Sequence, residues 1–296
     1  MLDRRYILQL VTIKKKQNDG TLLQATFAPM RGMNLVSLKK GDVELIQQST
    51  YPLFEERFAG LGALIGPHFY QRAEIKTFPS LPLDLFPHFP SMLAQGKKDP
   101  FSHGIGRYVP WRYQADETHL QARITSSDQY KGFLLEQLEG KHFVMNFEAS
   151  CLEDRLKIIL RTKSDSESVI GLHYYFAMGK AANIKAAISP LCYQEGQKVA
   201  VPAPWLESPS QLNLPVDTPI DTGLVPLLSH GVGHITLATE HYRLHLTIRP
   251  LAGSEYSFQV WHPQGSDFVC VEPISAENPR GKTLNEGALE IDFMID

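Results

Sequence analysis

Residues 6–13 read YILQLVTI, residues 17–20 read QNDG and residues 22–27 read LLQATF. The first and last of these segments alternate apolar with other side chains, which is typical of β-strands because successive side chains point to opposite faces. Asp19 and Gly20 between them favour a tight hairpin turn, since glycine accepts the positive φ that such turns require. This stretch therefore predicts a β-hairpin.

The same pattern recurs along the chain. We expect a second hairpin from residues 34–38 and 43–47 around Gly41, and a third from residues 143–152 and 155–162 around Asp154. Further strands are predicted at residues 234–239, 242–249, 256–261, 268–271 and 289–294. Few segments have a helical apolar period, although a short helix is expected near residues 52–58. Many short strands predict an all-β fold, a large sandwich or barrel that forms one domain over residues 1–296.

Two segments are rich in proline. Residues 78–100 contain Pro79, Pro82, Pro87 and Pro90, and residues 201–226 contain Pro202, Pro204, Pro209, Pro215, Pro219 and Pro226. Proline has no N–H to give to a sheet, so we expect neither segment to form a central strand. Both are predicted to be long loops, and long ordered loops on a β scaffold commonly build binding sites.

The composition excludes several classes of protein. The 296 residues are 43% hydrophobic and 21% charged, with a formal net charge of -3. This gives neither the basic surface of a nucleic-acid-binding protein nor a polybasic membrane patch. The three cysteines, Cys151, Cys192 and Cys270, form no Cys-x-x-Cys pair, so we expect neither a disulfide framework nor a structural zinc site. No targeting signal or membrane-spanning stretch is evident, which favours a cytoplasmic protein.

Four short clusters hold residue types that can do chemistry. They are residues 66–72 (GPHFYQR), 102–107 (SHGIGR), 171–176 (GLHYYF) and 268–273 (FVCVEP). A histidine among apolar residues, such as His173, is by itself more often structural than catalytic, and the glycines beside His103 can simply mark a turn. Glu272 is more informative, because it follows an apolar strand. Burial there would raise the pKa of Glu272, unless a cation offset the shift, and would prepare it to accept a proton.

Together the four clusters resemble the motifs of the aldose 1-epimerase (galactose mutarotase) family, in the same order along the chain. His103-Gly104 with Arg107 is similar to the family's His-Gly-Phe-Ala-Arg motif, with Ile-Gly in place of Phe-Ala. Residues 171–176 resemble Gly-Leu-His-Pro-Tyr-Phe around a second histidine, with Tyr174 at the proline position. Residues 269–273 match the motif that carries the family's catalytic glutamate.

The resemblance also suggests sugar-binding residues. Arg72 stands where the family has a substrate-binding arginine. Asp221 is the best match for a sugar-binding aspartate, with Asp217 as a competitor. Trp261 lies where the family places residues that contact the sugar ring, and an aromatic ring can stack on the C–H face of a pyranose, although Trp261 can equally belong to the core.

The resemblance implies a large antiparallel β-supersandwich that interconverts the α and β anomers of a free sugar. Glu272 would accept the proton of the anomeric hydroxyl, and His173, whose ordinary pKa is near 6.5, would donate one to the ring oxygen. His103 would hydrogen-bond the sugar and stabilise charge near the ring oxygen, while Arg72 and Asp221 would hold sugar hydroxyls. No metal or organic cofactor is implied, and the expected partner is a sugar, bound by a monomer or a homodimer.

Three alternatives stay open at this point. A hexose-6-phosphate mutarotase would need basic residues at the rim of the pocket, for which Arg72, Arg107 and Arg112 are candidates. A non-catalytic carbohydrate-binding protein could reuse the same fold. A glycosidase would need two carboxylates, for example Asp221 and Glu272, about 5–9.5 Å apart.

Overall fold

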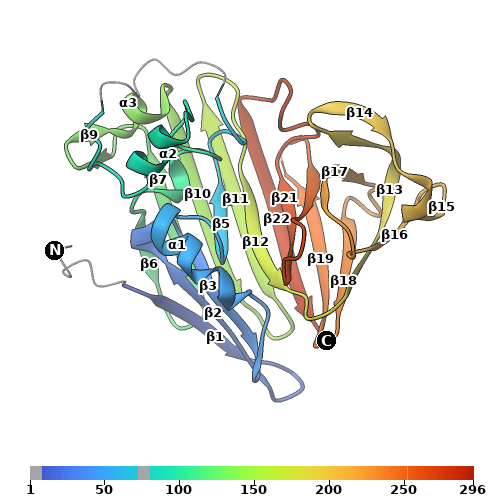
Figure 1. Cartoon of the computed structure of the whole chain (residues 1–296). Helices are drawn as coiled ribbons and strands as arrows, with labels where there is room; N and C mark the ends of the chain where they lie inside the picture. The colour runs from blue at the N-terminus through green and yellow to red at the C-terminus, as the bar shows by residue number, and fades with distance from the viewer. Residues whose placement is uncertain (1–8, 73–80, 252) are drawn as a thin grey trace.

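In the computed structural model, residues 9–72, 81–251 and 253–296 are described, and they form a mainly antiparallel β structure (Figure 1). A four-stranded sheet near the N-terminus has the order β1-β2-β3-β4. Its strands are β1 (Val11–Lys16), β2 (Leu22–Ala28), β3 (Asn34–Lys40) and β4 (Val43–Glu44). The antiparallel β class predicted from the sequence is thus confirmed.

The second sheet has 16 strands and carries the rest of the fold. Its main path is β5 (Gly62–Ile65), β12 (Gly171–Ala177), β21 (Phe268–Ile274), β20 (Ser257–His262), β17 (Ile220–Pro226), β13 (Ala182–Gln194), β18 (Gly233–Thr239), β19 (Arg243–Pro250), β22 (Glu286–Ile295), β11 (Leu156–Ser164), β10 (Phe143–Cys151), β7 (His119–Thr125) and β6 (Arg112–Ala115). Off this path, β14 (Gln197–Ala200), β15 (Leu206–Ser208) and β16 (Gln211–Pro215) extend the sheet beside β13.

The short elements lie between these strands. The α-helices are α1 (Tyr51–Arg57), α2 (Phe89–Ala94) and α3 (Leu135–Glu139), and β8 (Gln129–Tyr130) pairs with β9 (Phe133–Leu134). The 3-10 turns are η1 (Pro29–Arg31), η2 (Gln48–Thr50), η4 (Ile105–Arg107) and η5 (Ala203–Trp205). Across the described ranges, no helix has the length and apolar character needed to cross a membrane.

The N-terminal sheet bridges two parts of the large sheet that are far apart along its path. In the folded chain β3 contacts β5 at one end of the path, whereas β1 and β2 contact β10 near the other end. Figure 1 shows the N-terminal strands, in blue, crossing beside β10 and β5. This arrangement encloses a continuous apolar core around residues such as Phe27 and Phe147, whose rings meet edge to face at 5.5 Å.

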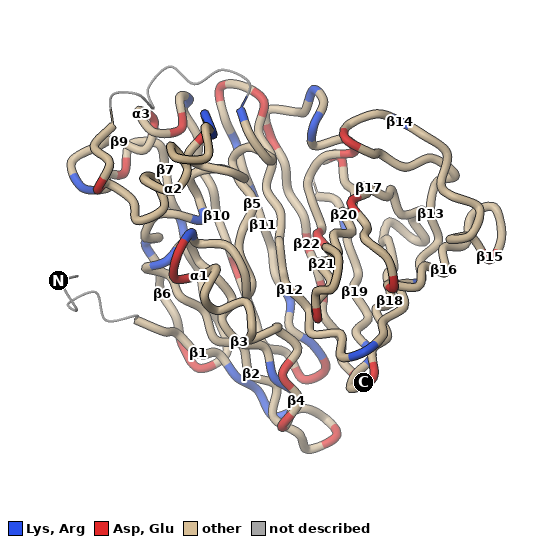
Figure 2. Tube along the Cα trace, viewed as in Figure 1, with Lys and Arg blue, Asp and Glu red and all other residues tan. Residues whose placement is uncertain are grey.

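Burial separates two kinds of strand. In β10 and β22 buried and half-exposed residues alternate, as expected for strands with one face toward the core. Every residue of β5 and β21 is buried, and in β12 only the last residue is not. Polar side chains on β12 and β21 are therefore held away from bulk water. Outside these buried strands, acidic and basic residues are interspersed along the chain, as Figure 2 shows.

Most of the predicted hairpins are confirmed. In the first, Val11 pairs with Phe27 and Lys16 with Leu22; residues 6–8 of the predicted strand lie outside the described residues. The third pairs β10 with β11 along their whole length, and α1 matches the helix expected near residues 52–58. The second hairpin is shorter than predicted, because β4 ends at Glu44.

The prediction for residues 201–226 was wrong, because this segment contains β15, β16 and β17. Strand β17 even lies inside the large sheet, between β20 and β13. Pro215 and Pro226 are the last residues of their strands, and Pro209 and Pro219 lie between strands, where no ladder donor is required. Of the other proline-rich segment, residues 78–80 are outside the described ranges, and the remainder is irregular apart from α2, where Pro90 lies in the first turn.

Candidate active site

A cavity of about 430 Å³ opens over the buried strands β12 and β21. Six of the seven site residues predicted from the sequence line this cavity: His103, Arg107, His173, Asp221, Trp261 and Glu272. Arg72 does not. The fold thus brings together residues that are up to 169 positions apart in the chain, since His103 and Glu272 lie on the same cavity.

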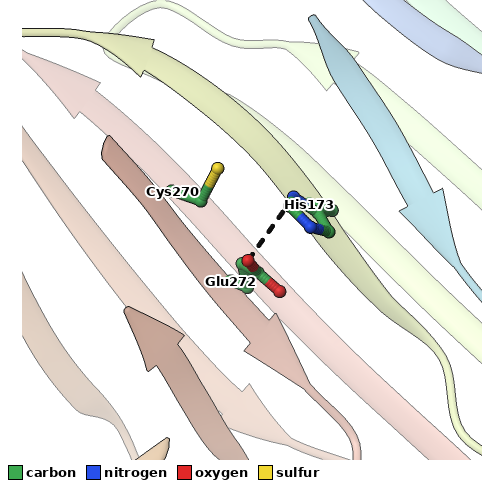
Figure 3. Close-up of side chains that lie close together, drawn as sticks. All are labelled: His173, Cys270 and Glu272. Atoms are coloured by element: carbon green, nitrogen blue, oxygen red, sulfur yellow. Dashed lines mark ion pairs between the residues drawn. The ribbon is translucent and has the colours of Figure 1, made fainter. Parts of the chain in front are cut away.

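Glu272 and His173 lie side by side at this cavity (Figure 3). Their side chains come from neighbouring strands, β21 and β12, and His173 Nδ1 lies 3.4 Å from Glu272 Oε1. The residues are only 2% and 7% exposed, respectively. The contact lacks hydrogen-bond geometry, and the buried Nδ1 has no hydrogen-bond partner among the described residues. The two groups are therefore close neighbours that no hydrogen bond fixes to one another.

The sheet is interrupted at this pair. Strands β12 and β21 pair at Gly171–Ile274 and again at Tyr175–Cys270, but not at the three positions between, which include His173 and Glu272. Pro273 has no N–H to donate, yet β21 continues to Ile274 instead of ending at residue 271 as the sequence suggested. The proline is tolerated because the ladder is already open at this position.

Burial shifts the pKa values of the pair in opposite directions. It raises the pKa of Glu272 well above its ordinary value, against the opposing charge of Arg107. It lowers the pKa of His173 well below 6.5, and Arg107 adds to this effect. Burial therefore favours the uncharged form of both groups, a protonated Glu272 carboxyl beside a neutral His173 ring. The expected upward shift at Glu272 is found, whereas His173 holds its proton less readily than the sequence suggested.

His103 is held in an unusual backbone conformation. Its φ is 64°, and Gly104 follows with a φ of 86°. The His103 N–H donates to the carbonyl of Tyr70 (2.7 Å), and the Gly66 N–H donates to the carbonyl of His103 (2.8 Å). The imidazole ring meets the ring of His173 edge to face at 5.2 Å. Burial lowers the pKa of His103 well below 6.5, so the ring is neutral beside the pair.

Arg107 carries a positive charge under the cavity. It is 4% exposed, and its Nε–H donates to the carbonyl of Leu64 at 3.0 Å. Its Nη2 is buried and has no hydrogen-bond partner within the described part of the chain. The guanidinium thus keeps hydrogen-bonding capacity to spare, and its charge lowers the pKa of both His103 and His173.

Asp221 and Trp261 occupy the next two strands. They face each other in the pairing of β17 with β20, and the Trp261 ring lies edge-on to the His173 ring at 5.7 Å. Of the two aspartates considered from the sequence, Asp221 lines the cavity and Asp217 does not.

No protein-family model and no curated protein matches the sequence. Solved structures do match over 97% of the chain. A galactose mutarotase related enzyme from Lactobacillus acidophilus superposes with a TM-score of 0.65 at 13% identity, over 97% of its own length. The chain has the galactose mutarotase-like fold. Galactose mutarotase-like proteins from Lactobacillus casei and Clostridium acetobutylicum also match, both with a TM-score of 0.62, at 16% and 13% identity and over 100% and 98% of their lengths.

Arg72 has a structural position outside the cavity in this galactose mutarotase-like fold. Its guanidinium contacts the buried carboxylate of Asp99 at 2.7 Å and donates to the carbonyls of Leu138 and Glu139. The Glu139 carboxylate in turn accepts a hydrogen bond from the Ile105 N–H at 3.0 Å, two residues after His103. The sequence suggested that Arg72 binds the sugar, but the structure does not bring Arg72 to the cavity. The buried carboxylate of Asp99 and the two carbonyls occupy its donors.

We expect Arg72→Gln to lower the free energy of unfolding by about 1.5–3 kcal/mol, because it removes charge-assisted hydrogen bonds from a buried carboxylate. Denaturant unfolding would measure this loss. Arg112→Gln is the matched control, since Arg112 has a 67% exposed side chain and a surface ion pair with Asp128. Equal, small effects of the two substitutions would contradict this structural role.

The sequence analysis missed several residues that line the cavity, among them Arg280 and Gln259. Arg280 lies 4.4 Å from the centroid of the Tyr70 ring and 3.7 Å from Asp221, and supplies an arginine to the cavity from the segment after β21. No local pattern marked it. Gln259 pairs with Glu272 across β20 and β21. Its spacing of two residues from Trp261 could have placed both side chains on one face.

Donor atoms of His173, Cys270 and Glu272 all lie within 4.8 Å of one another (Figure 3). A nitrogen, a sulfur and an oxygen donor could together hold a divalent metal ion. Burial raises the pKa of Cys270 well above its ordinary value, however, and a protonated thiol is a poor ligand.

Proposed function

We propose that this protein is a mutarotase, which interconverts the α and β anomers of a free aldose. The observation that carries the proposal is the buried contact of Glu272 with His173 at 3.4 Å, where the two residues line one cavity. Mutarotation requires a general base for the anomeric hydroxyl and a general acid for the ring oxygen. Two neighbouring groups whose pKa values shift in opposite directions suit that requirement.

In the proposed reaction Glu272 accepts the proton of the anomeric hydroxyl while His173 donates one to the ring oxygen. The C1–O5 bond breaks, the anomeric hydroxyl becomes the aldehyde, and C1 rotates before the reverse steps close the ring on its other face. A hydrogen bond from the sugar hydroxyl stabilises the Glu272 carboxylate, which moves the pair's proton to His173. The charges of Arg107 and Arg280 act in the same direction at Glu272.

The other cavity residues have supporting roles in this proposal. His103 contacts the His173 ring, and in this proposal it hydrogen-bonds the sugar near the ring oxygen. Asp221, held by Arg280, accepts hydrogen bonds from sugar hydroxyls. Trp261 supplies an aromatic surface for the C–H face of the pyranose.

In the pH profile of kcat/KM, the acidic limb should lie at a lower pH than an ordinary histidine would give. The reaction needs one proton on the pair, so kcat/KM falls when the pair takes up a second proton and when it loses its only one. Because the pKa of His173 lies below its ordinary value, the second proton binds at lower pH, and the acidic limb should fall below the ordinary histidine pKa of about 6.5. Polarimetry over a pH series would test this. An acidic limb at or above that value would contradict the assignment.

The proposal is tested by polarimetry on freshly dissolved α-D-glucose and α-D-galactose. Acceleration of the approach to the anomeric equilibrium, in proportion to protein concentration, is the expected result. Binding of either sugar without acceleration would instead indicate a carbohydrate-binding protein.

A further inference from the structure

The cavity continues beyond the catalytic pair to the ends of two short helices. On that side it is lined by Glu56 and Arg57 at the end of α1, by His88 at the start of α2, and by Lys97 after it. Arg57 lies close enough for its charge to lower the pKa values of His88 and His173. Figure 2 shows acidic and basic residues together at the end of α1.

The lining carries more uncompensated positive than negative charge. Its four cations are Arg57, Lys97, Arg107 and Arg280, and its three acids are Glu56, Asp221 and Glu272. Asp221 faces Arg280, and burial favours the uncharged form of Glu272. Glu56 is thus the one remaining charged acid of this lining, opposite the three cations Arg57, Lys97 and Arg107.

Two of these cations are at the exposed rim. Arg57 and Lys97 are solvent-exposed and form no ion pair with any residue in the described ranges. Arg107 is buried, and its Nη2 has no hydrogen-bond partner among those residues. A cleft with an excess of one charge concentrates ligands of the opposite charge.

We infer that the sugar carries an anionic group, a phosphate monoester or a carboxylate, that Arg57 and Lys97 bind at the rim of the cavity. This inference rests on the proposed function, because the anomeric carbon must lie at Glu272 and His173 and leaves the far end of the sugar toward α1 and α2. Arginine and lysine are the usual ligands of both anions. Of the arginines that the sequence offered for this role, Arg72 and Arg112 do not line the cavity.

Isothermal titration calorimetry tests the inference independently of catalysis. The probes are glucose, glucose 6-phosphate and glucuronate, the last two with the anion on C6, and inorganic phosphate alone. At low ionic strength we expect one of the two anionic sugars to bind about tenfold or more tightly than glucose, an advantage that added salt reduces. The better of the two identifies the anion as phosphate or carboxylate.

Three variants test whether Arg57 and Lys97 cause this difference in affinity. Arg57→Gln and Lys97→Gln should each reduce the ratio of the glucose Kd to the anionic-sugar Kd by about tenfold. Lys98→Gln removes the neighbouring exposed charge that does not line the cavity and should leave the ratio unchanged. Equal affinity for all three sugars, or an equal loss in Lys98→Gln, would overturn the inference. Absence of mutarotation together with a large affinity ratio would overturn only the proposed function.

Discussion

Gly104→Ala is expected to destabilise the protein by about 3–5 kcal/mol, because a new side chain would add both backbone strain and a steric clash. Gly104 has a φ of 86°, and a Cβ there would lie 2.1 Å from the carbonyl oxygen of Gly66. That oxygen belongs to the backbone and also accepts the Gly106 N–H, so it cannot move freely. The His103 loop would have to shift, and activity should fall with stability.

Gly96→Ala separates the two contributions. Gly96 has a φ of 66°, but a Cβ there meets nothing within 4 Å. It should therefore show only the cost of the left-handed backbone, about 1–2 kcal/mol. Thermal or denaturant unfolding of both variants would measure the difference. Similar losses in the two would show that the close approach of Gly104 to Gly66 contributes little.

Glu272→Gln should reduce the rate of mutarotation by about 10²–10⁴-fold, the usual contribution of a general acid or base. The substitution keeps the shape of the side chain and removes its ability to exchange a proton. Because burial already favours the uncharged form of Glu272, the amide should cost little stability. Polarimetry gives the rate, and unfolding shows whether the fold is kept.

Glu117→Gln is the matched control, since Glu117 is an exposed residue between β6 and β7 that does not line the cavity. It should leave the rate unchanged. A Glu272→Gln protein with nearly full activity would remove Glu272 from the mechanism and direct attention to Asp221 as the remaining cavity carboxylate of the β17–β20 pair.

The sequence predicted the fold well where local signals determine it. Alternation and turn residues identify β2, β10, β11, β18 and β19, because each pairs with a neighbour along the chain. It failed at residues 201–226, where prolines suggested loops. Those prolines lie at strand ends or between strands, a detail that depends on which neighbour each strand meets.

The same distinction applies to the candidate site, where local motifs identified some residues of the cavity and not others. The motifs around His103, His173 and Glu272 identify residues that line one cavity, because each motif lies on or beside a buried strand. Arg72 and Arg280, unlike Arg107, could not be assigned in this way. Whether a guanidinium enters the cavity depends on distant partners, Asp99 and two carbonyls for Arg72, and Asp221 and Tyr70 for Arg280.

The most direct test of the account is the rate of exchange between sugar anomers at equilibrium, measured by proton NMR exchange spectroscopy. It would compare the wild type with Glu272→Gln, His173→Asn and the double variant. If the two residues share one proton and act as a unit, each single variant loses about 10²–10⁴-fold and the double variant loses no more than the worse single one. Exchange that the wild type does not accelerate, or losses that multiply in the double variant, would contradict the account.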